Sequence, residues 1–414
     1  MATRRQMMAS LAGITGLAAL KAAPSLEAAP PTSASDKLDE FIKSKMGRDH
    51  IPGVTACIFT REGIRWIGSY GWANIERKIP MTADGLQNIC SISKTFTTTA
   101  LMQLWQAGKL KLDDDVNDYL PMAVRNPNHP SAKITFRHLL THRSSIRDGS
   151  AYARYYGCGD PSLSLADWMK SYFVPGGSNY DRGGNFHPFG PEGGWDYCNV
   201  AYGLIAYLVE EIAKVPFAQY CNERIFAPLE MRETSWYLAG IDTSRHTTPY
   251  TWIAPDGKAR GPSWGGVPQG VLREPGATGT LAPGMQPNCL YNHPNFPDGF
   301  LRTSLVQLSR YARTYLGGGA LGKTRILEQR SVDEMLKTQL IQGQRVQGLT
   351  WYASTTKVRN ETPWGHGGSD PGINTDLRIL PGEGIGAIAF MNTNGVRPEE
   401  ITRQLLLVAP ELMG

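Results

Sequence analysis

Ser91 and Lys94 are the residues of this chain best placed to do chemistry, because they set a hydroxyl and an amine three positions apart. On a helix this spacing puts both side chains on one face, so the amine can take the proton of the hydroxyl. Apolar residues continue at helical spacing from Phe96 to Trp105, and Gly108 ends the pattern, which predicts a buried helix starting near the serine. The pair therefore predicts an activated serine nucleophile; the alternative is a helix N-cap followed by a solvated lysine.

The same spacing occurs a second time, at Ser354 and Lys357. This pair lies in a polar stretch without apolar residues at helical spacing, so nothing predicts a helix that would bring the two side chains together. We therefore do not expect Ser354 to act as a nucleophile.

A lysine base needs a second group that passes its proton on and an amide that orients the substrate. Tyr197 and Asn199 supply both, in a Tyr-Cys-Asn triplet that follows a Gly/Pro-rich stretch and precedes an apolar helical pattern. An identical triplet begins at Tyr220, but it lies inside the next helical pattern. We expect Tyr220 to pack there and Asn222 to face water.

The stretch from Trp364 to Ser369 reads Trp-Gly-His-Gly-Gly-Ser. Gly367 and Gly368 would let a strand edge approach a ligand closely, and His366 could contact a bound carbonyl or carboxylate. This stretch is the third candidate element of the site. The alternative is a hairpin turn with an exposed histidine.

Strand-like patterns open and close the chain. Residues 53–60 and 66–71 predict one pair of strands, and residues 375–380 and 386–392 predict another, followed by a helix over 399–408. Helical patterns lie between these ends, at residues 96–108, 136–140, 202–214, 217–226 and 305–316.

The simplest fold is therefore of the α/β class, with an antiparallel sheet flanked by helices and a helical lobe inserted into it. We predict a catalytic domain over 32–414, with a sheet lobe from about 36–90 and 345–414 and a helical lobe from about 91–344. A cleft between two such lobes is a common place for an active site.

Residues 150–194 are rich in Gly, Pro and aromatic side chains, among them Tyr152 and Tyr156. A long loop of this composition predicts either a lid or wall of a substrate pocket or plain packing against the helical lobe.

Two further motifs lack the context that their chemistry needs. Ser263 lies in a Gly-Pro-Ser-Trp-Gly stretch that resembles a nucleophile elbow, but no buried strand precedes it and no helix follows. Residues 317–324 match the phosphate-binding P-loop pattern, but a helical pattern precedes them where a strand is required. We expect neither a second nucleophile nor a nucleotide site.

Composition excludes several classes of partner. The net charge of +5 is modest, and no Lys/Arg-rich run lies beyond the first residues, so we expect no nucleic-acid partner. No segment offers about 18 uninterrupted apolar residues, so we expect no permanent membrane span. The six cysteines lack metal-ligand spacing, which predicts mostly buried free thiols, with Cys90 and Cys198 beside the site and an oxidised pair left open.

The N-terminus carries Arg4 and Arg5, then a weakly apolar run to Leu20 and an Ala/Pro-rich stretch to Pro31. This arrangement predicts a twin-arginine export signal and linker over 1–31, and hence a periplasmic or secreted protein. The alternative is a cytoplasmic protein whose leader does not function.

The three elements, in the order Ser91/Lys94, Tyr197/Asn199 and His366/Gly368, resemble those of one serine hydrolase superfamily. It comprises the class C beta-lactamases, the penicillin-binding proteins and their esterase and D-aminopeptidase relatives. The resemblance covers residues 36–408, and it includes four supporting stretches, at 111–116, 134–142, 226–231 and 365–368.

The resemblance implies a beta-lactamase/transpeptidase-like fold and an acyl-enzyme formed on Ser91, with no metal or organic cofactor. Lys94 and Tyr197 would share the proton transfer and titrate as a coupled pair, and Asn199 would orient the substrate. The backbone N–H groups of Ser91 and Ser369 would form the oxyanion hole.

One departure from the family concerns the third element, where beta-lactamases and many penicillin-binding proteins carry Lys-Thr-Gly. The His366-Gly367-Gly368 sequence of this chain is more similar to that of esterases, amidases and peptidases. We therefore expect a small-molecule ester or peptide substrate. The alternatives are a peptidase or amidase on peptides with D-residues, a beta-lactamase, and a non-catalytic penicillin-binding-like sensor. The sequence makes no prediction of oligomeric state.

Overall fold

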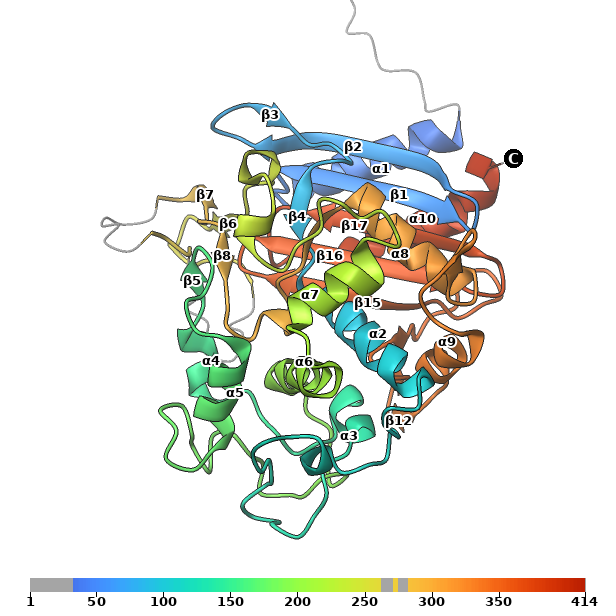
Figure 1. The fold of residues 1–414 in the computed structure, drawn as a ribbon. Helices are drawn as coiled ribbons and strands as arrows, with labels where there is room; N and C mark the ends of the chain where they lie inside the picture. Colours follow the sequence, from blue (N-terminus) through green and yellow to red (C-terminus); the bar gives the residue numbers. More distant parts are fainter. Residues whose placement is uncertain (1–32, 262–270, 275–281, 414) are drawn as a thin grey trace, which may run out of the picture.

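A nine-stranded antiparallel sheet joins the two ends of the chain (Figure 1), in the order β12-β13-β14-β15-β16-β17-β1-β2-β3. The computed structural model describes residues 33–261, 271–274 and 282–413. The predicted export signal and Ser263 lie outside these residues. The sheet consists of β1 (Gly53–Thr60), β2 (Ile64–Asn74), β3 (Ile79–Pro80), β12 (Leu340–Gln342), β13 (Arg345–Gln347), β14 (Tyr352–Ala353), β15 (Trp364–Asp370), β16 (Ile373–Leu380) and β17 (Ile385–Met391).

The central strands β1 and β17 are buried on both faces, because helices cover the sheet on both sides. Successive side chains of a strand point to opposite faces. In β1, Val54, Ala56 and Ile58 belong to one apolar cluster and Cys57 and Phe59 to the other. Helices α1 (Ala34–Arg48) and α10 (Pro398–Met413) contribute to the first cluster.

The second cluster joins the sheet to a layer of helices built from the middle of the chain. Within it, α2 (Ser93–Gln106) packs beside α6 (Val200–Ala213) and runs under the sheet (Figure 1). The other helices of this layer are α3 (Phe136–Leu140), α4 (Ser150–Arg154), α5 (Leu165–Phe173), α7 (Phe217–Cys221), α8 (Leu305–Leu316) and α9 (Gln329–Leu336). The sheet built from both ends and the helical middle agree with the architecture expected from the periodicity.

Short strand pairs connect segments outside the large sheet. They are β4 (Leu86–Asn88) with β9 (Arg302–Ser304), β5 (Gly157–Cys158) with β8 (Tyr291–Asn292), β6 (Tyr250–Ile253) with β7 (Gly284–Pro287), and β10 (Ala320–Leu321) with β11 (Thr324–Arg325). None of these two- to four-residue strands was predicted from the sequence, because such short runs carry no periodicity.

Cys158 and Cys289 form a disulfide, with a Cα–Cα distance of 5.7 Å, beside the β5–β8 pair. The remaining cysteines of the chain, Cys57, Cys90, Cys198 and Cys221, are free and buried. The expectation of mostly buried free thiols therefore holds for four of the six, and the oxidised pair left open by the sequence is present.

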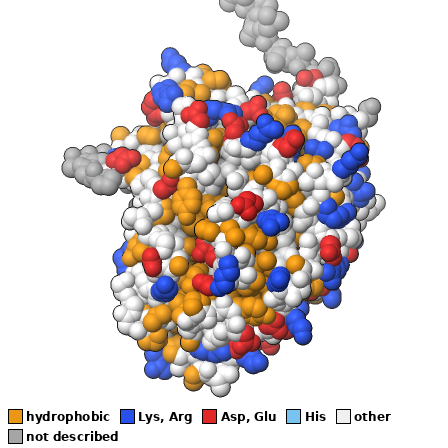
Figure 2. Space-filling view, in the orientation of Figure 1, with side chains coloured by type: hydrophobic (Ala, Val, Ile, Leu, Met, Phe, Trp, Pro, Cys, Tyr) orange, Lys and Arg blue, Asp and Glu red, His pale blue; other side chains and the backbone are white. Residues whose placement is uncertain are grey.

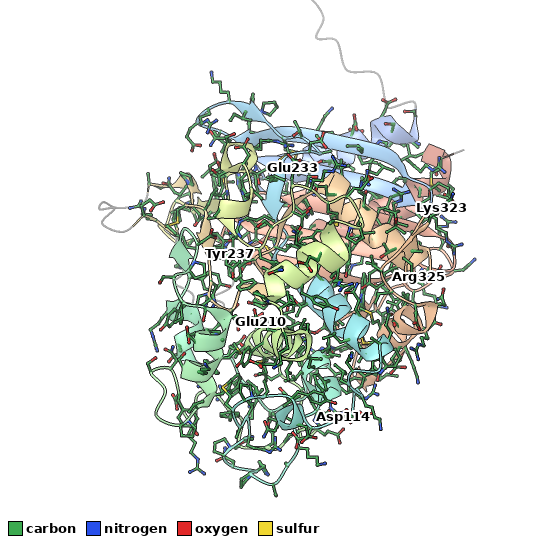
Figure 3. The ribbon with its side chains drawn as sticks, in the orientation of Figure 1. Asp114, Glu210, Glu233, Tyr237, Lys323 and Arg325 are labelled. Atoms are coloured by element: carbon green, nitrogen blue, oxygen red, sulfur yellow. A yellow bond between two sulfur atoms is a disulfide. The ribbon has the colours of Figure 1, made fainter. Side chains whose placement is uncertain are left out.

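Residues 317–324 form the turn after α8 and most of the β10–β11 hairpin, so no strand precedes them, as expected. Lys323 and Arg325 lie at the outer edge of the molecule (Figure 3). Arg325 donates to the carbonyl oxygens of Gly318 and Leu327 at 2.6 and 2.8 Å, so it closes its own loop.

The visible surface shows positive and negative side chains interspersed, with apolar side chains between them (Figure 2). Within the described ranges, no helix has the length and apolar character that crossing a bilayer requires.

Candidate active site

Ser91 lies in the short turn η1 (Cys90–Ile92) that leads into α2, so its hydroxyl lies near the positive end of that helix. The residue before it, Cys90, has a φ of 50°, which is uncommon for a residue with a side chain. The N–H of Cys90 donates to Asn88 Oδ1 at 2.9 Å, which holds this turn. The predicted helix after the serine is thus present, and a strained turn presents Ser91 at its start.

Lys94 is wholly buried beneath Ser91, with 0% of its surface exposed. Its amine donates to Ser91 Oγ at 3.1 Å, to Asn199 Oδ1 at 2.7 Å and to the carbonyl oxygen of Asp298 at 2.8 Å. Burial alone would lower the pKa of Lys94, but Tyr197 and the Asp298 carboxylate 3.6 Å away favour the charged amine, so its pKa is raised.

The ring of Tyr197 lies against the same amine, with its centroid 4.9 Å from Lys94 Nζ. Burial raises the pKa of the Tyr197 phenol, and this outweighs the effects of Lys94 and of a hydrogen bond with Ser91, both of which lower the pKa. Tyr197 also stacks on His142, with 4.4 Å between ring centroids. The structure thus brings Ser91, Lys94 and Tyr197 together.

Asn199 is held by Asp148, a residue that sequence reasoning missed. Asp148 accepts from the backbone N–H of Asn199 at 2.8 Å, from Asn199 Nδ2 at 2.8 Å and from the N–H of Val200 at 2.9 Å. These bonds satisfy the N-terminus of α6 and turn the amide oxygen of Asn199 toward Lys94. Asp148 stands in an irregular loop, where neither spacing nor periodicity marks a functional residue.

The strand β15 brings the third element against the nucleophile. Strand β14 pairs only with Trp364 and Gly365, and among the described residues no other strand pairs with the rest of this edge of β15. A Cβ at Gly368 would lie 2.6 Å from the carbonyl oxygen of Ile89 and 2.8 Å from Cys90 Cβ. Glycine at this position therefore allows the strand to pack directly on the turn that carries Ser91.

His366 is buried, with 4% of its surface exposed, and its Nδ1 lies 2.6 Å from the carbonyl oxygen of Gly367. The alternative of an exposed histidine in a hairpin turn is therefore wrong. Burial lowers the pKa of His366 to about 3, so the ring is neutral. The centroid of its ring lies 6.5 Å from that of Tyr197. The residues that line the cavity described below do not include His366, Gly367 or Gly368.

A cavity of ≈ 290 Å³ opens over these groups. Of the residues predicted from the sequence, Ser91, Tyr197, Asn199 and Ser369 line it, and Lys94 lies beneath its floor. The other lining residues are Arg147, Asp148, Tyr152, Tyr156, Asp196, Asp298 and Asp370.

Tyr152 and Tyr156 come from the aromatic segment 150–194, so part of that segment forms a pocket wall and other parts, such as Trp168, pack in the core. No motif or spacing in the sequence marked Asp298 or Asp370 as a candidate site residue. The fold brings each of them to the cavity from a distant loop or strand end.

The described residues contain one cluster with enough ligand atoms for a metal ion, made of Cys158, Glu274 and Cys289. Its two cysteines are joined to each other in the disulfide, so they are not available as thiolate ligands.

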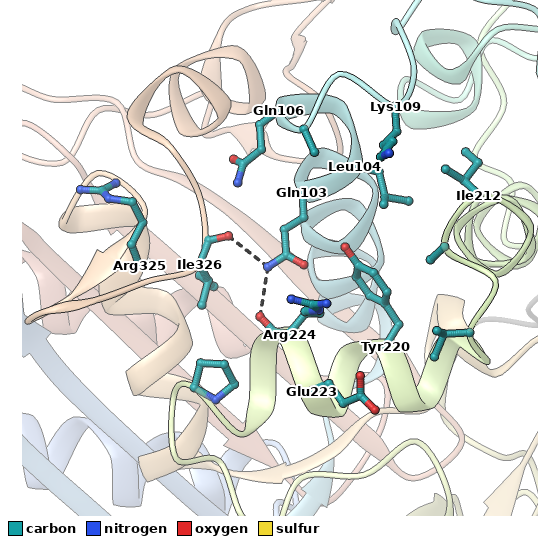
Figure 4. Close-up of a pocket in the computed structure, with 14 residues that line it drawn as sticks. Gln103, Leu104, Gln106, Lys109, Ile212, Tyr220, Glu223, Arg224, Arg325 and Ile326 are labelled. Atoms are coloured by element: carbon teal, nitrogen blue, oxygen red, sulfur yellow. Dashed lines mark hydrogen bonds between the residues drawn. The ribbon is translucent and has the colours of Figure 1, made fainter.

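A second groove, of ≈ 640 Å³, lies at the far end of α2 between α6, α7 and β11 (Figure 4). Gln103 extends into it, but its amide donates to the carbonyl oxygens of Arg224 and Ile326 at 3.1 and 3.0 Å. This groove contains no nucleophile and base at hydrogen-bonding distance, unlike the cavity at Ser91.

Comparison with known proteins identifies the class that this fold and site define. The model of the family described as Beta-lactamase matches residues 38–409, and the chain belongs to this family of serine hydrolases. The resemblance stated from the motifs and the predicted beta-lactamase/transpeptidase-like fold are both confirmed.

Among curated proteins, the chain is similar to Penicillin-binding protein 4* of Bacillus subtilis (strain 168), with 30% identity over 180 residues, or 43% of this chain and 36% of the relative. It is also similar to Protein flp of Staphylococcus aureus (strain N315), with 25% identity over 203 residues, or 49% of this chain and 38% of the relative. The chain thus spans little more than a third of the length of either relative.

Solved structures share the fold at low identity. A D-amino acid amidase from Ochrobactrum anthropi SV3 has a TM-score of 0.69 and 20% identity, covering 92% of this chain and 100% of that one. An octameric penicillin-binding protein homologue from Pyrococcus abyssi has a TM-score of 0.66 and 21% identity, and the match covers 91% of this chain and 77% of that one. The D-alanine carboxypeptidase AmpC from Burkholderia cenocepacia has a TM-score of 0.64 and 20% identity, and the match covers 91% of this chain and 99% of that one.

Proposed function

We propose that the protein hydrolyses an ester or amide bond through an acyl-enzyme on Ser91. The observation that carries the proposal is the position of Lys94 Nζ, 3.1 Å from Ser91 Oγ and 2.7 Å from Asn199 Oδ1, with Tyr197 against it. A hydroxyl in contact with a buried amine and a phenol is the arrangement that activates a serine.

In the proposed reaction Ser91 Oγ attacks the carbonyl carbon while its proton passes to the Lys94–Tyr197 pair. The backbone N–H groups of Ser91 and Ser369 hold the developing oxyanion. The bond to the leaving alcohol or amine then breaks, and the pair returns the proton to it. Water adds to the acyl carbonyl in the second half, and cleavage of the acyl bond restores the Ser91 hydroxyl.

Two features favour ester, amide or peptide substrates over beta-lactams. A neutral, buried His366 stands where beta-lactamases carry a lysine, so the cationic group of that motif is missing. The similar solved structures include a D-amino acid amidase. Turnover of simple aryl esters compared with small D-amino-acid amides separates an esterase from the alternative of a peptidase or amidase.

Peptide mapping after treatment with a fluorophosphonate probe tests the proposal. We expect one adduct, on Ser91, that is absent in Ser91→Ala and unchanged in Ser354→Ala, the serine of the second Ser-x-x-Lys sequence. An adduct on Ser263 instead would overturn the assignment. A Ser91→Ala variant that still hydrolyses every substrate of the wild type would do the same, and absence of any turnover by the wild type would favour a non-catalytic sensor.

We also propose that the protein is exported with the twin-arginine signal that includes Arg4 and Arg5. The Cys158–Cys289 disulfide supports this location, because disulfides persist mainly in oxidising compartments. Cell fractionation tests it: replacement of both arginines by lysine should retain the full-length protein in the cytoplasm, and unchanged export would contradict the proposal.

A further inference from the structure

Four carboxylates line the cavity beside Ser91, and three of them contact N–H donors, a histidine or an amine. Asp148 accepts three N–H bonds from Asn199 and Val200. Asp196 lies 2.8 Å from His187 Nε2. Asp298 lies 3.6 Å from the amine of Lys94.

Asp370 is the fourth carboxylate, and its hydrogen-bond partners carry no positive charge. It accepts from the Tyr156 hydroxyl at 2.9 Å and is hydrogen-bonded with the Cys90 thiol. Its side chain lines the cavity, although only 6% of its surface is exposed. Among the ion pairs of the described residues, none includes Asp370, and the nearby Lys94 is paired with Asp298 instead.

A buried carboxylate without a cationic partner is costly, and proteins retain such groups mainly where function needs them. Burial and the neighbouring Asp298 raise the pKa of Asp370 to about 7, which reflects this cost. The hydroxyls of Tyr152 and Tyr156 lie 3.4 Å apart and donate to Asp298 and Asp370 respectively, so the two carboxylates and two phenols form one polar wall.

We infer that Asp370 binds a protonated amine on the acyl part of the substrate, so that the protein prefers amino-acid or peptide substrates with a free amine close to the scissile carbonyl. The inference rests on the proposed function, because it names the substrate class of the same site.

The position of Asp370 supports an amine close to the reacting carbonyl. Asp370 follows Ser369, whose N–H would hold the carbonyl oxygen, and both residues line the cavity with Ser91. A metal ion fits this wall less well, because no three carboxylates of the described cavity residues converge closely enough to share an ion.

The test compares three p-nitroanilides that differ in one group: a free amino acid, its N-acetyl derivative and its desamino analogue, with both enantiomers of the first two. We expect the wild type to prefer the free amine by about 10- to 100-fold in kcat/KM, the range for a hydrogen bond to a charged group. Asp370→Asn should abolish that preference and leave turnover of the desamino analogue within about 3-fold.

Asp196→Asn is the matched control, since Asp196 lines the same cavity but already contacts His187. It should keep the preference for the amine. An equal loss in Asp196→Asn would overturn the inference in favour of a general negative field. A wild type that hydrolyses the desamino analogue at least as well as the free amine would overturn it without any variant.

Binding to Ser91→Ala separates this inference from the proposed function. Calorimetric titration with the amino-acid amide should show binding that the additional Asp370→Asn change weakens by at least about 10-fold. Lack of a Ser91 adduct together with this binding would reject the hydrolase and keep the amine site. A Ser91 adduct with no effect of Asp370→Asn on binding would reject the amine site alone.

Discussion

At the scale of single residues, the proposed reaction passes the serine proton to Lys94 and Tyr197, and both groups bind protons tightly. The pKa values of Lys94 and Tyr197 are each raised above their ordinary values of 10.5 and 10.0. Loss of one proton from the pair creates the general base, and that proton belongs to the pair and not to either residue.

We therefore expect kcat/KM to rise continuously from about pH 6 to about pH 10 on a stable aryl amide, because the fraction of deprotonated pair grows with pH. The rate of Ser91→Ala serves as the blank at each pH. Tyr197→Phe should lower kcat/KM by about 10²- to 10⁴-fold, the usual contribution of a proton-transferring group. A flat profile between about pH 6 and about pH 10 would place the base elsewhere.

The buried carboxyl of Asp370 also predicts how the stability of the protein changes with pH. Its pKa is about 7 in the folded protein against an ordinary value of 3.8, so between these values the folded state binds a proton that the unfolded state has lost. Its contribution to stability therefore falls as pH rises from about 4 to about 7. The titratable and charged groups that interact with this carboxyl are Asp298, Lys94, Cys90, Tyr152, Tyr156, Tyr291 and Arg302.

Asp370→Asn removes the buried charge, so the variant should have a higher Tm than the wild type, and the difference should be larger at pH 8 than at pH 5. Thermal unfolding followed by circular dichroism at both pH values measures it. A difference that is constant or shrinks with rising pH would show that the carboxyl is not buried at a cost.

Residues were predictable from the sequence where short spacing fixes their geometry. Ser91 with Lys94, and Tyr197 with Asn199, each lie within four positions, so local patterns could find them. Asp298 and Asp370 reach the cavity only because distant segments fold together, and no periodicity describes that step.

At the scale of elements, the contact between β15 and the turn before Ser91 sets the geometry of the proposed oxyanion site. Gly368 lies between Ile89 and Thr375, whose hydroxyl donates to the carbonyl oxygen of Ile89 at 2.9 Å. A side chain at Gly368 would separate the strand from this turn.

Gly368→Ala should therefore destabilise the protein by about 1–3 kcal/mol, the range for overpacking a buried site, and should lower kcat more than it raises KM. Gly367→Ala is the control in stability, because the atom nearest to its Cβ would be Asp376 Oδ1, at an ordinary contact distance of 3.5 Å. Urea unfolding of both variants checks the difference. Equal loss of stability in the two would refute the packing argument.

The long periodic elements were predictable, and the pairing of short strands was not. The periodicity placed a helix at 305–316 and strands at both ends of the chain, where the structure has α8, β1, β16 and β17. The pairs β4–β9 and β5–β8 depend on which loops meet after the sheet and helices have packed.

At the scale of the whole molecule, the Cys158–Cys289 disulfide links two segments that are 131 residues apart in the sequence. A cross-link that closes so long a loop restricts the unfolded chain strongly. Its loss should also loosen the segment that carries Tyr156.

Replacement of both cysteines by serine should lower the free energy of unfolding by roughly 2–5 kcal/mol. Urea unfolding with and without reductant measures it: reductant should destabilise the wild type and leave the double variant unchanged. Equal midpoints for the oxidised and reduced wild type would contradict the expected contribution.

The pairing of β1 with β17 also determines when the nascent chain can complete its sheet. Val54 lies opposite Met391, so roughly 340 residues must be synthesised before the first strand meets its partner. At about 5–20 residues per second the ribosome needs tens of seconds for this. The strand β15, which completes the wall behind Ser91, is among the last elements to emerge, so a nascent chain has its serine and lysine long before it has an active site.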